Sequence, residues 1–500
     1  MSGSKQIKIG AVLSYVSIAL NIVAGLIYTP WMIDQIGDSD YGLYTLANSL
    51  ITLFIVDFGL GSAVSRYVSK YRAECRQDKV DNFLGAVYKL YLIIDAIVFI
   101  ALVVVFFCLE SIYVKLTPAE LEKFKIVYII SGLFAVVNFP FVTLNGIINA
   151  YEKFIQLKLA DIIYRILLVG TTVVALLFGY GLYALVATHA IVGILIILYK
   201  LIVIKRSVPV KVNFKHAEKG LYKEIFSFSI WITISLLAQR LVFNITPSIL
   251  GVVASTAAIA VFGVITTIEG YAYTITNAIN GMFMPRIAKI YADGNAEKNI
   301  TPLFLGVGKF QYALNGLIVA GFAVVGRSFI NLWVGPDYSS AYYGILLVII
   351  PGLFFNSLHI ANTAMVVQKK VNVQACVGVI VGVANVILSF VLSSYFGVVG
   401  AAASIFAVYM LRAVLYNIIY YKVLKFDIPR FIRECYLRMS VPIIVSVAAG
   451  FLMNYFVGDG GWLVLVAKGF VTVVIYLLTV LFVGLNREEK NKIISKMRRK

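Results

Sequence analysis

The sequence predicts an all-α integral membrane protein with fourteen transmembrane helices. Three observations lead to this prediction: an apolar composition, long apolar runs along the whole chain, and basic residues that gather in alternate loops. Of the 500 residues, 61% are hydrophobic and only 13% are charged, and the mean hydropathy is +0.92. Such a chain is more apolar than a soluble globular domain.

The apolar runs are roughly 20 residues or longer, enough to cross a hydrocarbon core of about 30 Å as a helix. They are longer than the strands of a membrane barrel and lack the alternation of such strands. The first run is interpreted as a span and not as a removable signal, because no small-residue cleavage site follows it. We expect helices centred near Leu20, Ile51, Ala96, Ala135, Thr171, Ile191, Ser235, Ile268, Leu317, Ile350, Val383, Met410, Val447 and Ile475.

The basic residues test this count, because cytoplasmic loops collect lysine and arginine. Of 43 basic residues, 33 lie in the N-terminal segment, alternate loops and the C-terminal tail, 5 lie in the other loops and 5 lie within spans. This alternation predicts cytoplasmic termini in a multi-pass protein of the cell membrane. It also accounts for the net charge of +19, which we assign to loops facing anionic lipid and not to nucleic-acid binding.

The connections between spans are too short to hold a catalytic domain, so the sequence predicts a protein that is not an enzyme. The four cysteines have no spacing typical of a metal site, and neither a metal nor a cofactor is expected. The chain contains no GxxxxGK[ST] segment. We therefore expect an ion gradient or the membrane potential to drive any transport, and not ATP.

An internal repeat divides the chain into two lobes of six helices. Thr29-Pro30 matches Thr246-Pro247, and FGYGLYALV from Phe178 aligns with FGVVGAAAS from Phe396. Both copies begin in the cytoplasm, which predicts parallel lobes around a central cleft and a transporter that works by alternating access. We expect the lobes at residues 1–210 and 211–430. Residues 431–500 add two helices, expected to pack beside one lobe, and a basic cytoplasmic tail.

Several segments resemble a known family. PWMIDQIGDSDYGLYTLANSL and DFGLGSAVSRYVSKY resemble the opening of Wzx-type polysaccharide repeat-unit flippases, and ADGNAEK, INLWVGPDYSSAYYGILLVIIPG and FGVVGAAAS look similar to its second half. That family belongs to a broader group with multidrug extrusion proteins and lipid II flippases. The resemblance implies a flippase that moves a polyprenyl-pyrophosphate-linked oligosaccharide to the outer leaflet for O-antigen, capsule or exopolysaccharide synthesis.

The resemblance also implies partners: the lipid-linked oligosaccharide, a coupling ion that is sodium or a proton, membrane lipid, and a polymerase with other polysaccharide-assembly proteins. Lipid II flippases carry an arginine in the first helix, whereas Ile9 to Ile33 holds no charge here, which disfavours lipid II as the substrate. Two alternatives stay open. One is a cation-coupled multidrug antiporter of the same fold, and the other is a membrane-embedded glycan polymerase or ligase.

Asp57 follows the apolar run NSLITLFIV in the second predicted helix. If that helix starts near Tyr41, Asp57 lies about 24 Å along it and Arg66 about 37 Å along it. Asp57 is then a cleft carboxylate for a coupling ion or a sugar, or else it pairs with a lysine or arginine at the helix end. Arg66 and its repeat equivalent Arg286 are topology anchors at the cytoplasmic entrance, or first contacts for a pyrophosphate.

Two charges lie deep in predicted spans, where an ion is costly and faces protein or water. Arg240 in LLAQRLVFN and Glu269 in ITTIEGYAY lie on adjacent helices, so we expect them close together in the cleft. One interpretation is that Arg240 contacts the pyrophosphate and that Glu269 balances it, binds the coupling cation or takes a proton. The other is a buried structural ion pair. Asn244 and Tyr273 lie one turn from these charges and suit a sugar.

The remaining charges within spans receive mainly structural interpretations. Asp161 and Arg165 stand in i, i+4 register and are expected to neutralise each other. Asp95, a further candidate for the coupling ion, and Arg412 are assigned to helices at the lobe flanks. His189 is expected to be a hydrogen-bonded packing residue.

Overall fold

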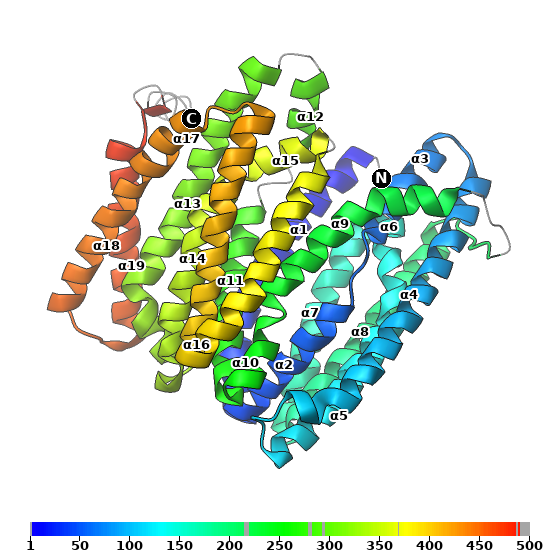
Figure 1. The fold of residues 1–500 in the computed structure, drawn as a ribbon, viewed down its shortest axis with the longest axis horizontal. Coiled ribbons are helices and arrows are strands. Elements are labelled where there is room, and N and C mark those ends of the chain that lie inside the picture. The colour runs from blue at the N-terminus through cyan, green and yellow to red at the C-terminus, as the bar shows by residue number, and fades with distance from the viewer. Residues whose placement is uncertain are drawn as a thin grey trace. The chain divides into compact units, whose positions relative to one another are not determined.

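A computed structural model describes residues 3–214, 220–278, 283–292, 296–368, 370–486 and 489–490, and every regular element in these ranges is a helix (Figure 1). Two compact units are present, Met1–Gly263 with Gly378–Val386 and Val264–Val377 with Ile387–Lys500, here called unit 1 and unit 2. The unit boundary differs from the predicted lobe boundary near residue 210, and the division by repeat stays a prediction.

The helices of the first part of the chain are α1 (Gly3–Ile36), α2 (Asp38–Phe54), α3 (Leu60–Ala73), α4 (Gln77–Ile112), α5 (Pro118–Asn138), η1 (Phe139–Val142), α6 (Thr143–Ala150), α7 (Phe154–Leu177), α8 (Gly181–Ser207), α9 (Leu221–Phe243), α10 (Thr246–Val253) and α11 (Thr256–Asn277). Those that follow are α12 (Met284–Ala292), α13 (Ala296–Trp333), η3 (Pro336–Tyr338), α14 (Ser340–Ser357), α15 (His359–Val367), α16 (Val371–Leu424), α17 (Ile428–Phe431), η4 (Ile432–Leu437), α18 (Arg438–Phe456), α19 (Gly461–Thr479) and η5 (Val480–Gly484).

Among the described residues, twelve helical segments are long and apolar enough to cross a membrane. The predicted centre near Ile51 falls in α2, which has only 17 residues. The centres near Val383 and Met410 both fall in α16, which runs for 54 residues with a non-helical residue, Gly397, inside it. The multi-pass helical fold is confirmed, whereas the count of fourteen and the cytoplasmic termini stay predictions.

Gly397 reverses the direction of α16. Its backbone angles are φ 55° and ψ −133°, in the region that only glycine adopts without strain. A β-carbon at nearby Gly400 would collide with the carbonyl oxygen of Leu392, so the chain passes close to itself at this bend. Figure 1 shows the two parts of α16 lying side by side as an antiparallel pair, and each part is longer than the roughly 20 residues that a span requires.

The second predicted helix is interrupted where the sequence analysis expected it to continue. Helix α2 ends at Phe54, and α3 begins at Leu60 after a turn in which Phe58 and Gly59 have φ angles of 51° and 67°. The expected positions of Asp57 and Arg66, about 24 Å and 37 Å along one continuous helix, are therefore wrong. Asp57 lies in the turn itself, and Arg66 lies on α3.

Unit 1 packs its helices in close pairs, of which α7 with α8, α1 with α7, α2 with α5 and α3 with α6 are the most extensive. Small residues permit close approach of such helices in a membrane protein. A β-carbon at Gly146 on α6 would lie 2.7 Å from the carbonyl oxygen of Gly61 on α3. The buried core beside this contact combines α3 and α4 and includes Tyr67, Phe83 and Tyr91.

Unit 2 is built around α13, which packs against α14, α18 and α19. Gly450 on α18 leaves space for Val324 on α13, since a β-carbon there would collide with the valine side chain. The hydroxyl of Tyr476 on α19 donates to the carbonyl oxygen of Ala313 on α13 at 2.8 Å. Both added helices, α18 and α19, pack on α13 within unit 2. The expectation that they lie beside one lobe stays a prediction, as the division into lobes does.

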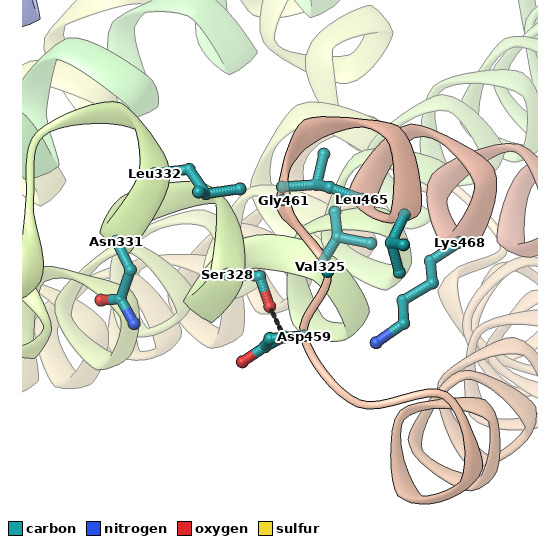
Figure 2. A pocket seen from close by; sticks show the side chains of 10 residues that line it. Val325, Ser328, Asn331, Leu332, Asp459, Gly461, Leu465 and Lys468 are labelled. Carbon is teal, nitrogen blue, oxygen red and sulfur yellow. Dashed lines mark hydrogen bonds between the residues drawn. The ribbon is translucent and has the colours of Figure 1, made fainter.

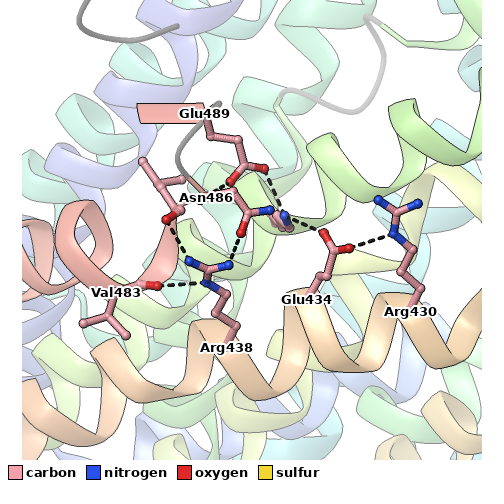
Figure 3. A network of polar contacts seen from close by, with 8 residues as sticks. Arg430, Glu434, Arg438, Val483, Asn486 and Glu489 are labelled. Atoms are coloured by element: carbon pink, nitrogen blue, oxygen red, sulfur yellow. Dashed lines mark hydrogen bonds and ion pairs between the residues drawn. The ribbon is translucent and has the colours of Figure 1, made fainter. Parts of the chain in front are cut away.

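A polar network joins the ends of these helices (Figure 3). Lys309 on α13 has a side chain only 7% exposed and lies 3.0 Å from the Glu434 carboxylate and 2.9 Å from that of Glu489. Arg430 pairs with Glu434 at 2.7 Å, and the guanidinium of Arg438 donates to the carbonyl oxygens at the end of η5. A buried lysine is tolerated in a membrane protein when carboxylates neutralise it, so this network fixes α18 and η5 to α13.

Candidate functional site

A polar cavity of about 200 Å³ lies inside unit 1, between helices α2, α5, α8 and α9. Each helix contributes a group that can hydrogen-bond to a ligand. Helix α2 does so through residues spaced four apart, which lie on one face of a helix. The polar and aromatic lining consists of Tyr44, Asn48, Thr52, Ser131, Phe134, Asn138, His189 and Arg240.

Arg240, predicted to contact the substrate, lines this cavity from the last turn of α9. Asn244 follows as the cap of α9, and its backbone N–H donates to the carbonyl oxygen of Arg240 at 3.0 Å. Asn244 is not among the residues that line the cavity. Arg240 therefore reaches the site, whereas Asn244 terminates the helix that carries it.

Arg165 on α7 is a second cation beside the cavity, and the sequence analysis missed its role. Its guanidinium interacts electrostatically with Tyr44 and His189, both of which line the cavity. Its Nη2 donates to the carbonyl oxygen of Asn21 at 3.4 Å, while its buried Nε has no hydrogen-bond partner among the described residues. One guanidinium thus lines the cavity, and a second lies within electrostatic range of its wall.

The expected neutralisation of Arg165 by Asp161 is wrong. The Asp161 carboxylate pairs instead with the ammonium of Lys158, one turn earlier on α7, at 3.1 Å. Residues three apart on a helix are neighbours just as residues four apart are, so both partners were within reach and the lysine binds. Arg165 therefore forms no ion pair among the described residues, and its guanidinium interacts electrostatically with Tyr44 and His189 of the cavity.

His189 forms a hydrogen bond, as expected, because its Nε2 lies 2.6 Å from the hydroxyl oxygen of Tyr164. It also lines the cavity, which was not predicted. The imidazole of His189 also interacts electrostatically with Arg165. The cavity thus combines one lining cation, Arg240, with an imidazole, hydroxyl groups and amides, and a second cation, Arg165, lies within electrostatic range of its wall.

Unit 2 contains a separate polar cluster in which α11 carries Glu269 and Tyr273. Tyr273 interacts electrostatically with both Glu269 and Arg412 of α16, and so does Tyr409. The guanidinium carbon of Arg412 lies 4.1 Å from the ring centre of Phe355. This packing brings Arg412 into the same cluster as Glu269, and the assignment of its helix to a lobe flank stays a prediction.

Arg240 belongs to unit 1 and Glu269 belongs to unit 2. The two residues thus belong to different units, and the expected proximity of Arg240 and Glu269 stays a prediction. Neither Glu269 nor Tyr273 belongs to the cavity in unit 1. Tyr273 is 43% exposed on α11.

Asp57 holds the start of α3. Its carboxylate accepts from the backbone N–H of Gly61 at 3.1 Å and from the hydroxyl of Tyr91 on α4. A β-carbon at Gly61 would lie 2.9 Å from the same carboxylate, which explains glycine at that position. The partners of Asp57 are thus an amide and a phenol, and not the lysine or arginine considered from the sequence.

The other predicted site residues are not among those that line the cavity. Arg66 is exposed on α3, with its guanidinium 5.9 Å from the ring centre of Tyr67, and Arg286 is exposed on α12. Asp95 lies on α4, and its buried Oδ1 has no hydrogen-bond partner among the described residues. The roles predicted for these three residues stay predictions.

Comparison with known proteins identifies the family. Residues 9–291 match the model of a family described as polysaccharide biosynthesis protein. A sequence comparison with curated proteins found no match. Because the matched segment covers more than half of the chain, the predicted resemblance to a family of polysaccharide biosynthesis proteins is confirmed.

Three solved structures share the fold. The lipid II flippase MurJ in an inward closed conformation gives a TM-score of 0.72 at 15% identity, over 94% of this chain and 98% of that one. An inward-facing multidrug resistance transporter of the MATE family gives 0.69 at 13%, over 81% and 96%. A MOP superfamily transporter from Pyrococcus furiosus gives 0.57 at 14%, over 83% and 93%. This chain belongs to the polysaccharide biosynthesis protein family and is a multi-pass membrane protein with the fold shared by this flippase and these transporters.

Proposed function

We propose that the protein is a Wzx-type flippase that moves a polyprenyl-pyrophosphate-linked oligosaccharide from the inner to the outer leaflet for surface polysaccharide synthesis. The observation that carries the proposal is the cavity in unit 1, lined by Arg240 with Arg165 beside it. Guanidinium groups bind phosphate oxygens through two parallel hydrogen bonds. In a chain of the polysaccharide biosynthesis family, such a cavity is suited to the pyrophosphate that links lipid and sugar.

The remaining lining of the cavity suits the first sugar. Asn48, Asn138 and Ser131 offer donors and acceptors, and Tyr44 and Phe134 offer aromatic surfaces. Amide and hydroxyl groups match the hydroxyls of a sugar because each can both donate and accept. Substrate recognition in this proposal therefore combines a charged part, at the arginines, with a neutral polar part on α2 and α5.

The cluster in unit 2 is the proposed place for coupling to an ion. Glu269 forms no ion pair among the described residues, and Arg412 is held against aromatic rings nearby. A carboxylate in a span that lacks a bound cation partner can take a proton or a sodium ion. Asp57 and Asp95 stay secondary candidates, and Asp57 is the weaker because an amide and a phenol already occupy its carboxylate.

The charge of the cavity favours an anionic substrate over a cationic drug. None of the described residues that line the cavity is aspartate or glutamate, and Arg240 is the charged member of the lining. A cation-coupled multidrug antiporter of the same fold remains the second candidate, because a MATE transporter is among the structural neighbours. Such an antiporter would need a carboxylate where its cationic substrate binds.

Deleting the gene in the source organism separates the candidates. The flippase proposal predicts that a surface polysaccharide disappears and that its lipid-linked repeat unit accumulates where a membrane-impermeant glycan-modifying reagent cannot reach it in spheroplasts. Loss of a polymerase would leave repeat units that the reagent does modify. Loss of a drug antiporter would change drug sensitivity and leave the polysaccharide intact.

A further inference from the structure

A second cavity, of about 190 Å³, lies in unit 2, where the end of α13 meets the start of α19 (Figure 2). Ser328 and Asn331 line it from α13, Asp459 from the connection between α18 and α19, and Lys468 from α19. The described residues of the first cavity and of the Glu269 cluster do not take part. The function proposed above therefore makes no use of this cavity.

Lys468 is buried in the cavity wall, and no described carboxylate neutralises it. Only 4% of the residue is exposed, and its ammonium donates one hydrogen bond, to the carbonyl oxygen of Gly458 at 2.7 Å. An ammonium has three donors, and Lys468 forms no ion pair with any carboxylate of the described residues. The contrast with Lys309, which two carboxylates neutralise, indicates that Lys468 has donor capacity for a ligand.

Two side chains with acceptor oxygens, Asn331 and Asp459, line the same cavity. Asp459 accepts a hydrogen bond from the hydroxyl of Ser328, as Figure 2 shows, and its carboxylate has no cationic partner among the described residues. The Oδ1 atom of Asn331 is buried and has no hydrogen-bond partner in the described part of the chain. Burying a polar atom without a partner costs free energy. The cavity thus presents a cation and an anion that are not paired with each other.

We propose that this cavity binds a phosphoethanolamine group, the headgroup of a zwitterionic phospholipid. The phosphate accepts from the Lys468 ammonium and from backbone N–H groups at the start of α19, which no side chain caps because the capping residue is Gly460. The primary ammonium of the ligand donates to Asp459 and to Asn331. One ligand then neutralises both charges of the cavity: its phosphate neutralises Lys468, and its ammonium neutralises Asp459.

The surroundings of the cavity favour a lipid over a free headgroup. Trp462 and Leu463, beside the lining residues on α19, are 49% and 86% exposed. Tryptophan and exposed apolar residues at helix ends are typical of the interface between membrane and water. An acyl chain attached to the bound headgroup would cover these side chains, whereas a free headgroup would leave them in contact with other lipids.

Native mass spectrometry of the full-length protein in detergent tests the proposal. The protein is titrated with phosphatidylethanolamine, phosphatidylcholine and phosphatidylglycerol of identical acyl chains. We expect phosphatidylethanolamine to bind most tightly. The quaternary ammonium of choline cannot donate a hydrogen bond, and glycerol offers no cation to Asp459. Asp459→Asn should weaken phosphatidylethanolamine about tenfold, the effect of losing one charged hydrogen bond, and should leave phosphatidylglycerol unweakened.

Matched variants and a soluble competitor complete the test. Lys468→Gln should weaken phosphatidylethanolamine and phosphatidylglycerol alike, and Asp337→Asn, an exposed acid on the connection between α13 and α14, should weaken neither. Should Lys468→Gln fail to fold, Asp459→Asn still decides the result. Equal binding of the three lipids, or an Asp459→Asn variant with unchanged preference, overturns the proposal. If soluble glycerophosphoethanolamine binds as tightly as phosphatidylethanolamine, the claim that the ligand is a lipid and not a free headgroup is contradicted.

Discussion

The ammonium of Lys158 lies 3.1 Å from the carboxylate of Asp161 on α7, and Arg165, one turn later, forms no ion pair with any carboxylate of the described residues. The pair determines which charge of α7 is available to a ligand. If Asp161 paired with Arg165, the guanidinium beside the cavity would be neutralised, and the lysine would remain as the unbalanced cation on the helix.

The first prediction concerns this arrangement. Arg165→Gln should slow transport about tenfold or more, because one charged hydrogen bond to an anion contributes roughly 1.5–3 kcal/mol. Lys158→Gln should also slow transport, because Asp161 is then free to pair with Arg165. The double variant Lys158→Gln with Asp161→Asn should restore it. Transport rates in vesicles and expression levels are the measurements, and a slow double variant would contradict the mechanism.

A second prediction concerns the aromatic environment of Arg412. A cation held over a ring in a desolvated place gains roughly 2 kcal/mol, and the guanidinium carbon lies 4.1 Å from the Phe355 ring centre and 5.4 Å from that of Tyr416. Phe355→Leu should therefore lower the free energy of unfolding by ~1–2 kcal/mol when Arg412 is present. In an Arg412→Met background the same change should cost much less. Equal losses in the two backgrounds would show that the contact contributes nothing beyond packing.

The third prediction concerns the attachment of the added helices. Lys309→Met removes the cation between Glu434 and Glu489 and should destabilise the protein by ~1–3 kcal/mol, because it leaves two partly buried carboxylates close together. Adding Glu434→Gln and Glu489→Gln should recover most of the loss. Arg430→Gln, at a half-exposed position of the same network, should cost less than ~1 kcal/mol.

This network also decides how the added helices should be tested. Truncation after about Ile432 removes both glutamates and leaves Lys309 buried without a partner, so the truncated chain should carry Lys309→Met. We expect that protein to fold and to lose transport of the full-length carrier lipid, because α18 and α19 help to accommodate the polyprenyl tail. Normal transport by the truncated protein would refute this role. Thermal unfolding of the purified protein separates lost stability from lost transport.

The fourth prediction concerns orientation in the membrane. Cys75 is exposed on the connection after α3, which the basic residues assign to the cytoplasm, and Lys115 is exposed on a connection assigned to the outside. A variant with Cys75 as its sole cysteine should not react with an impermeant thiol reagent in intact cells. A cysteine-free variant with Lys115→Cys should react. The opposite pattern would invert the predicted topology.

Hydropathy predicts where helices lie because each span must satisfy its own backbone hydrogen bonds in lipid. It does not reveal where a helix stops inside the membrane. The break between α2 and α3 depends on Phe58 and Gly59 in left-handed conformations and on an acceptor, Asp57, for the first N–H groups of α3. The segment DFG is typical of no single structure. Because an apolar run precedes it and a helical pattern follows it, the sequence favours one continuous helix over a turn.

The site could be predicted only in part for a related reason. Arg240 could be identified because a charge within a span is costly and therefore conspicuous. Arg165 is equally conspicuous, yet its neighbour Asp161 suggested local pairing, and only the competing Lys158 shows otherwise. The segment KLAD contained that competitor at i−3, so the sequence offered the signal. Arg412 differs, since its contact with Phe355 depends on tertiary packing that no local pattern encodes.

Transbilayer movement of a polyprenyl-pyrophosphate-linked oligosaccharide in proteoliposomes tests the central claim most directly. With a fluorescent sugar and an impermeant quencher, the protein should bring inner-leaflet fluorescence within reach of the quencher. Arg240→Gln should slow this about tenfold or more. Arg240→Gln with Glu269→Gln should stay as slow, although both variants insert and fold. Movement no faster than in empty vesicles would contradict the flippase, and full recovery in the double variant would reduce Arg240 and Glu269 to a structural pair.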